Sequence, residues 1–120
     1  MFRSVIPVLH VSNAVMALEF YRRLGFSQRF AYRFDDAQPD PCYMGLTRDD
    51  VTLHISSFSG DGASGGAVFL VVEDVDALHI ELKAKGVTID LEPTDQSWGN
   101  REMYVVDPDG NSIRFVHGGA

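Results

Sequence analysis

The sequence is poor in cysteine and in basic side chains, and it has no long apolar run. Its single cysteine, Cys42, excludes an internal disulfide and a zinc site built from paired thiolates. Ten Lys and Arg stand against 17 Asp and Glu, a net charge of -7, which argues against binding to a phosphate backbone. No segment approaches the roughly 18 apolar residues of a membrane span, and Met1–Ser4 does not resemble a secretory signal. We therefore expect a soluble, cytoplasmic protein with neither nucleic acid nor membrane as a partner.

The remaining composition describes one globular domain. A chain of 120 residues, 45% of them apolar, has room for one sizeable core but not for two domains. Residues 1–60 carry six basic and six acidic side chains, whereas residues 61–120 carry four and 11. This acidic second half can attract a cationic small molecule or simply keep the chain in solution, and charge alone does not separate the two.

Strand and helix patterns alternate along the chain. Helical stripes of apolar residues cover Ala14–Leu24 and Val75–Lys85, with Ser12 or Asn13 and Asp74 as N-caps. Gly25 and Gly86 follow where a left-handed residue would end each helix. Seven or eight strands are expected, and the clear ones are Val5–Val11, Phe26–Phe34, Tyr43–Leu46, Val51–Ile55, Val68–Val72, Met103–Val106 and Ile113–Val116.

These elements indicate an internal repeat. Asn13–Gly25 and Asp74–Gly86 have equal length and lie 61 positions apart, so each half has the order strand, helix, three strands. The fold class is therefore α+β, with two βαβββ modules at about residues 4–57 and 67–117. A Gly- and Ser-rich linker at about 58–66 joins them, and within it Asp61 is a candidate contact for a cation.

Each module should bury one sheet face under its helix and leave the other open. Alternation predicts that Ile6, Val8 and His10, then Thr52, His54 and Ser56, lie on the open side of the first module. The corresponding residues of the second module are Ala67, Phe69, Val71, Ser112, Arg114 and Val116. Such a mixed apolar and polar face suits a ligand cleft or a partner surface.

Aromatic residues mark part of this surface. Phe30, Tyr32 and Phe34 alternate on one side of the second strand, as either helix-side core or a pocket wall. Trp98, the single tryptophan, follows a polar stretch and precedes Gly99, which favours a contact role. His54 stands in the middle of the open face and is either satisfied by a hydroxyl of Thr52 or Ser56 or contacts a ligand.

Several motifs resemble one known superfamily. The paired modules, Ile6-Pro7-Val8-Leu9, the helix end Phe20–Phe26 and the turn Asp107-Pro108-Asp109-Gly110-Asn111 are similar to the vicinal oxygen chelate superfamily of glyoxalases, bleomycin resistance proteins and dioxygenases. Arg48–Ser56 and Trp98-Gly99 with Arg101-Glu102 resemble its bleomycin resistance branch. That branch places aromatic residues at the Trp98 and Phe30 positions to stack a flat drug in a crevice between two subunits.

The resemblance also provides a test for metal-dependent chemistry. Enzymes of the superfamily hold a divalent cation at four positions, which here correspond to Ile6, His54, Ala67 and Arg114. One competent ligand of four falls short of the usual three, and a guanidinium repels cations. We therefore predict no metal, no cofactor and no catalytic residues.

The expected function is non-catalytic binding of a planar cationic ligand by a homodimer whose sheets form an open cleft. A glyoxalase-type lyase or dioxygenase with an atypical site is the alternative, and an accessory domain without a ligand is the third. The expected ligand-binding residues are Phe30, Tyr32, Phe34, His54, Ser56, Asp61 and Trp98.

Overall fold

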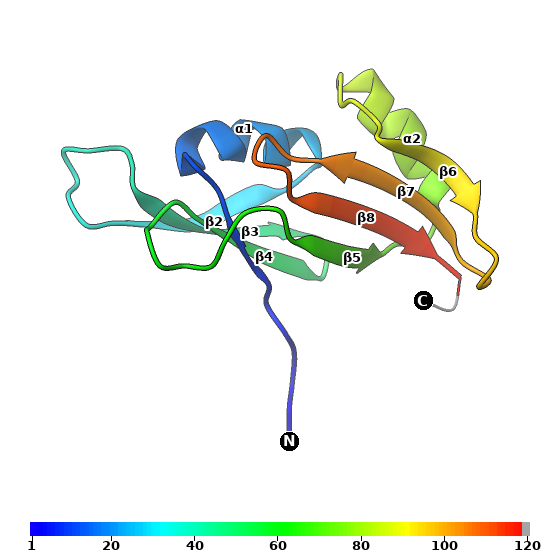
Figure 1. Cartoon of the computed structure of the whole chain (residues 1–120), viewed down its shortest axis with the longest axis horizontal. Helices are drawn as coiled ribbons and strands as arrows, with labels where there is room; N and C mark the ends of the chain where they lie inside the picture. Colours follow the sequence, from blue (N-terminus) through cyan, green and yellow to red (C-terminus); the bar gives the residue numbers. More distant parts are fainter. Residues whose placement is uncertain (119–120) are drawn as a thin grey trace. The chain divides into compact units, whose positions relative to one another are not determined.

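A computed structural model describes residues 1–118, and the chain divides into two units, Met1–Ser64 and Gly65–Ala120. The first unit contains β1 (Val8–His10), α1 (Ala14–Arg23), β2 (Ser27–Arg33), β3 (Cys42–Arg48) and β4 (Val51–Ser56). Its sheet has the order β1-β4-β3-β2, with β1 parallel to β4 and the other neighbours antiparallel. Helix α1 packs on one face of this sheet (Figure 1).

The second unit repeats this topology. It contains β5 (Ala67–Val71), α2 (Val75–Ala84), β6 (Leu91–Asp95), β7 (Arg101–Val106) and β8 (Ser112–His117), and its sheet has the order β5-β8-β7-β6. Strand β5 is parallel to β8, as β1 is to β4. The two βαβββ modules expected from the repeat are therefore confirmed.

The core of each unit lies between its helix and one sheet face. Tyr21 of α1 is fully buried with Leu53 and Ile55 of β4, and Leu82 of α2 is buried with Met103 and Ile113. Asn13 and Asp74 cap the helices, their side chains accepting from the amides of Met16 and Ala77. The local signals that predicted these helices are therefore the contacts that start them.

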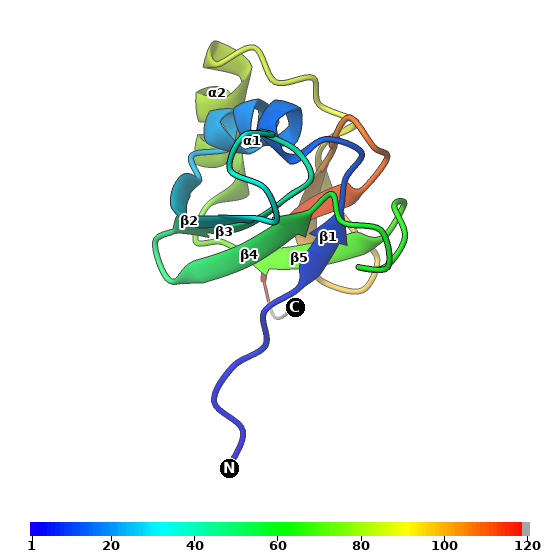
Figure 2. The ribbon, with the colours of Figure 1, turned by 90° about the vertical axis from the view of Figure 1, so that its left-hand side faces the viewer.

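The N-terminal strand is much shorter than expected. Strand β1 covers only Val8–His10, and Val5, the expected first residue of the strand, is 86% exposed. Figures 1 and 2 show the preceding segment running away from the sheet, and its last backbone bond to β4 joins the amide of His54 to the carbonyl of Pro7. Pro7 has no N–H group to donate, so the parallel ladder ends at this residue although β4 itself begins at Val51.

Strand β6 was not located by the sequence pattern. Leu91–Asp95 carries Pro93 and two charged residues, a composition that disfavours strands. It is tolerated because β6 is an edge strand of its sheet, where a residue without an N–H group breaks no ladder. Its register against β7 shifts between Leu91 and Thr94, so the proline lies in an irregular segment.

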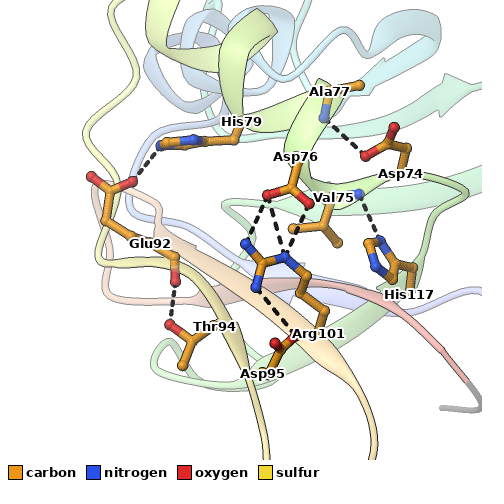
Figure 3. A network of polar contacts seen from close by, with 10 residues as sticks. All are labelled: Asp74, Val75, Asp76, Ala77, His79, Glu92, Thr94, Asp95, Arg101 and His117. Carbon is orange, nitrogen blue, oxygen red and sulfur yellow. Dashed lines mark hydrogen bonds and ion pairs between the residues drawn. The ribbon is translucent and has the colours of Figure 1, made fainter.

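Polar contacts fasten α2 to the start of β7 (Figure 3). Arg101 donates from Nε and Nη2 to the carboxylate of Asp76 on α2, and from Nη1 to Asp95 on β6. His117, at the end of β8, accepts from the amide of Val75 through Nδ1. Helix, edge strand and central strands are thus tied together at one end of the second unit.

No helix among residues 1–118 is both long and apolar enough to span a membrane.

Candidate functional site

The face of the first sheet opposite α1 presents two cross-strand rows of side chains. One row runs Val8, His54, Gly45, Phe30 across the four strands, and the next runs His10, Ser56, Tyr43, Tyr32. Phe30 and Tyr32 are 46% and 59% exposed, so these rings lie on the open face rather than in the helix-side core. Their alternation predicted either helix-side core or an exposed wall, and in the structure Phe30 and Tyr32 lie on the exposed side.

Phe30 can lie against the sheet because its neighbour is a glycine. A Cβ atom on Gly45 would stand 2.2 Å from Cε2 of Phe30, far inside contact distance. The ring stacks with Tyr43 at 6.3 Å between centroids and meets His54 edge-on at 5.4 Å. Tyr43 and His54 are also joined by a 2.7 Å hydrogen bond between the phenol oxygen and Nδ1. The three rings form one connected aromatic floor, and Tyr43 is a member that the sequence did not single out.

Polar groups border this floor. Ser56, which is buried, donates a 2.6 Å hydrogen bond from its hydroxyl to Asp61 and accepts from the amide of Phe58. Burial raises the pKa of Tyr43, and the negative charge of Asp61 raises it further. Tyr43 is therefore a neutral hydrogen-bonding group at physiological pH. Phe58, at the start of the linker, lies against Tyr32 with 6.1 Å between ring centroids. The linker therefore covers part of the row that contains Tyr32.

One sequence-based placement needs correction, and another residue is more buried than its face suggests. Phe34 was expected in alternation with Phe30 and Tyr32, but β2 ends at Arg33 and Phe34 is 84% exposed in the loop that follows. Val116 lies on the predicted face of the second sheet, the face of Arg114, but it is fully buried there opposite Glu102. The period of two predicts a face, but it does not predict where the strand ends or which neighbour covers the residue.

In the second unit, Trp98 lies in the turn between β6 and β7. The amide of Gln96 donates to the carbonyl of Asn100, and the amide of Gly99 donates to the carbonyl of Gln96. Gly99 has a φ of 100°, a value that favours glycine at this turn position. Trp98 is 64% exposed, but its indole Nε1 donates a 2.9 Å hydrogen bond to Glu102. A large ring is therefore presented outward from a fixed backbone and a fixed side-chain atom.

Glu102 is the centre of a polar cluster under this ring. Its carboxylate is fully buried and accepts from Trp98 and Asn100 at Oε2 and from the Tyr104 phenol at Oε1. Burial by itself would raise the pKa of Glu102, but these hydrogen bonds and the positive charge of Arg114 hold it below its ordinary value. The hydrogen bond to Glu102 is also the main reason that the pKa of Tyr104 is raised.

Arg114, on the central strand β8, lies on the face of the second sheet that is opposite α2. Its guanidinium lies 4.6 Å from the centroid of the Tyr104 ring and 5.9 Å from that of Phe69, and its Nε donates to Ser112. The sequence motif contained Glu102, but nothing in it indicated that the carboxylate would be buried under Trp98. That signal is three-dimensional, because Tyr104 and Asn100 reach Glu102 only once β7 and the turn are formed.

The family model and the solved structures agree with one another. The model of a family described as glyoxalase superfamily protein matches residues 1–119. The chain belongs to the glyoxalase superfamily. This confirms the resemblance drawn from the motifs, and no curated protein matched the chain.

Solved structures of bleomycin-binding and bleomycin resistance proteins are similar to almost the whole chain. A bleomycin-binding protein complexed with bleomycin has 27% identity and a TM-score of 0.76, over 98% of this chain and 99% of that one. A bleomycin resistance determinant encoded on transposon Tn5 has 26% identity and a TM-score of 0.77, over 99% and 100%. The bleomycin-binding protein of Streptomyces verticillus, complexed with copper(II)-bleomycin, has 29% identity and a TM-score of 0.75, over 98% of each chain.

The donor set at the superfamily's metal positions does not fit a metal ion. Ile6 offers only hydrocarbon and Ala67 a methyl group, while Arg114 is a permanent cation. His54, the remaining position, offers Nε2 because Nδ1 is bonded to Tyr43, but it is one competent ligand where a zinc site usually has three. Among residues 1–118, no group of three or more His, Cys, Asp or Glu side chains is placed to hold a metal ion.

Proposed function

We propose that this protein binds a planar, cationic small molecule of the bleomycin type without transforming it. The observation that carries the proposal is the exposed indole of Trp98, held in one place by Glu102. Flat aromatic ligands gain stacking energy from such a ring, and a cationic ligand gains in addition from the negative potential of the chain.

Three features support this function over others. Phe30 and Tyr32 offer a second exposed aromatic surface, and the rings of Tyr43 and His54 extend it with polar atoms at its edge. Asp61, bonded to Ser56, places a carboxylate beside this surface for a ligand cation. The neighbours solved with bleomycin bound are similar over nearly the full chain.

The test is calorimetric titration with metal-free bleomycin. Trp98→Ala should weaken binding by about 2 kcal/mol or more, roughly 30-fold, which is the scale of a desolvated aromatic contact. Ile80→Ala is the matched control, because it removes a side chain that is 72% exposed on α2 and should leave affinity unchanged. A Trp98→Ala variant that binds as tightly as the wild type would remove this residue from the site.

Added salt separates stacking from simple attraction of cations. At about 0.5 M salt, exposed charges are screened within a few ångströms, so a purely electrostatic interaction would be lost. We expect most of the affinity to persist and mainly the association rate to fall. Binding that disappears in salt while Trp98→Ala has no effect would assign the interaction to surface charge.

Metal content tests the enzymatic alternative. A single imidazole such as His54 does not retain zinc or iron against water and buffer. Elemental analysis of protein purified without chelator should therefore find much less than one metal ion per chain. One zinc, nickel or iron per chain would instead favour a lyase or dioxygenase with an unusual ligand set.

A further inference from the structure

The strongest unexplained feature is a buried carboxylate whose partners converge from one side. Glu102 is fully buried, whereas Trp98, one of its donors, is 64% exposed. Burying a charge is costly unless it is paired and hydrogen-bonded, so such a group calls for an explanation. The core of the second unit lies on the opposite side of β7, where Met103 and Val105 are buried, so Glu102 does not serve that core.

The two carboxylate oxygens of Glu102 accept different numbers of hydrogen bonds. Oε2 accepts from the Trp98 indole at 2.9 Å and from Asn100 at 3.2 Å, while Oε1 accepts from Tyr104 at 2.5 Å. The bonds from Asn100 and Tyr104 therefore fix the plane of the carboxylate. The other bond to Oε2, from the Trp98 indole, then fixes the position of that ring. The bond of Gln96 to Asn100 closes the turn that holds the Trp98 backbone.

We infer that Glu102 is a positioning residue, which holds the Trp98 ring in its ligand-stacking orientation before any ligand arrives. This inference rests on the proposed function for its effect on affinity, but the positioning itself is a property of the free protein. Ordering a side chain on binding lowers affinity, and a ring that is already ordered avoids that loss.

Two substitutions separate the acceptor from the charge. Glu102→Gln keeps an oxygen that can accept from Trp98 and Asn100, and its amide group can donate to the Tyr104 oxygen. Glu102→Met has similar volume but no strong acceptor, so the indole loses its anchor. Glu73→Gln is the matched control, since it removes one carboxylate from an exposed position.

The first measurement is time-resolved fluorescence anisotropy of the free protein, in which Trp98 is the single tryptophan. Wild type, Glu102→Gln and Glu73→Gln should show a ring that rotates with the whole protein. Glu102→Met, once circular dichroism shows that it is folded, should add a fast component of local ring motion. Equal anisotropy decays in wild type and folded Glu102→Met would overturn the inference.

The second measurement needs no substitution. In wild-type protein with labelled tryptophan, the indole hydrogen should exchange with solvent about tenfold or more slower than in free tryptophan, because a bond to a charged acceptor must open first. Exchange at the free rate would contradict the inference even if Glu102→Met fails to fold.

Titration with metal-free bleomycin then connects positioning to binding. Glu102→Met should bind about 3- to 10-fold more weakly than the wild type, and Glu102→Gln should stay close to it. If Trp98→Ala leaves binding intact, the proposed function fails at this residue while anisotropy and exchange still decide the positioning role. Equal losses in Glu102→Gln and Glu102→Met would assign the effect to charge and overturn the inference.

Discussion

Neighbouring residues of β7 serve opposite faces of the second sheet. Arg101 reaches Asp76 on α2, Glu102 reaches the Trp98 indole, and Met103 is buried in the core. Strand alternation alone produces this division, because successive side chains point to opposite faces. One short strand thus anchors the helix and orients the exposed ring.

The lowered pKa of Glu102 predicts a specific acid sensitivity. A carboxyl whose pKa is lower in the folded state stabilises the protein fully above its ordinary value of 4.5 and loses that contribution as pH falls through the lower folded value. Glu102→Gln should therefore be less stable than the wild type at neutral pH, and the difference should shrink in acid. Urea unfolding across this pH range measures it, with Glu73→Gln as the control. Wild-type and Glu102→Gln stabilities that differ by the same amount at every pH would contradict the assignment.

Gly45 makes a second prediction at residue scale. In Gly45→Ala the new methyl group would collide with the Phe30 ring, so the ring must leave the sheet and its stacking with Tyr43 is lost. We expect a loss of about 1 kcal/mol in unfolding free energy and weaker binding of metal-free bleomycin.

Gly66→Ala is the control for this substitution. The nearest atom to its new methyl group, Oδ1 of Asn111, would be 4.0 Å away. Thermal unfolding and calorimetry of both variants decide the matter. If Gly45→Ala behaves like Gly66→Ala, Phe30 does not depend on the glycine for its place.

At the scale of elements, the sequence was sufficient wherever the signal is local. Both helices follow from apolar stripes and from the caps Asn13 and Asp74, which the structure confirms as hydrogen-bonding groups. The internal repeat also follows from the sequence, and in the structure it extends to equivalent strand pairs, since Phe69 pairs with Arg114 as Val8 pairs with His54. Local composition failed for β6, where an edge position overrides the poor strand propensity of Pro93.

The candidate site was only partly predictable for a related reason. Exposed aromatic residues can be recognised from alternation and from turn composition, which is how Phe30, Tyr32 and Trp98 were selected. Tyr43 and Gly45 act through cross-strand neighbours that depend on register. Glu102 instead reaches Trp98, Asn100 and Tyr104 through the shape of the turn before β7 and the alternation along that strand. Register is set by the whole sheet and its bulges, so these roles become visible only in the folded chain.

For the whole molecule, we predict a homodimer. Four large apolar side chains on the open sheet faces are each more than 45% exposed: Phe30 and Tyr32 on the first sheet, Phe69 and Val71 on the second. Single exposed apolar residues are normal, but grouped ones mark an interaction surface. A stable interface covering such faces would bury more than about 2,000 Å². Light scattering at micromolar concentration should give about twice the chain mass of 13.3 kDa. A mass equal to one chain would rule the dimer out.

The composition of the outer strands has a consequence for how the protein behaves at high concentration. Unpaired strand edges can recruit strands of other molecules and grow into aggregates. At one edge of the second sheet, Pro93 lacks an N–H group and lies next to the charged Glu92, and Asp95 ends the strand. At one edge of the first sheet, β2 carries Arg29 and Arg33. These two edges resist addition of a further strand, so any growth by strand addition is directed to the opposite edges, β1 and β5, which contain no Lys, Arg, Asp or Glu.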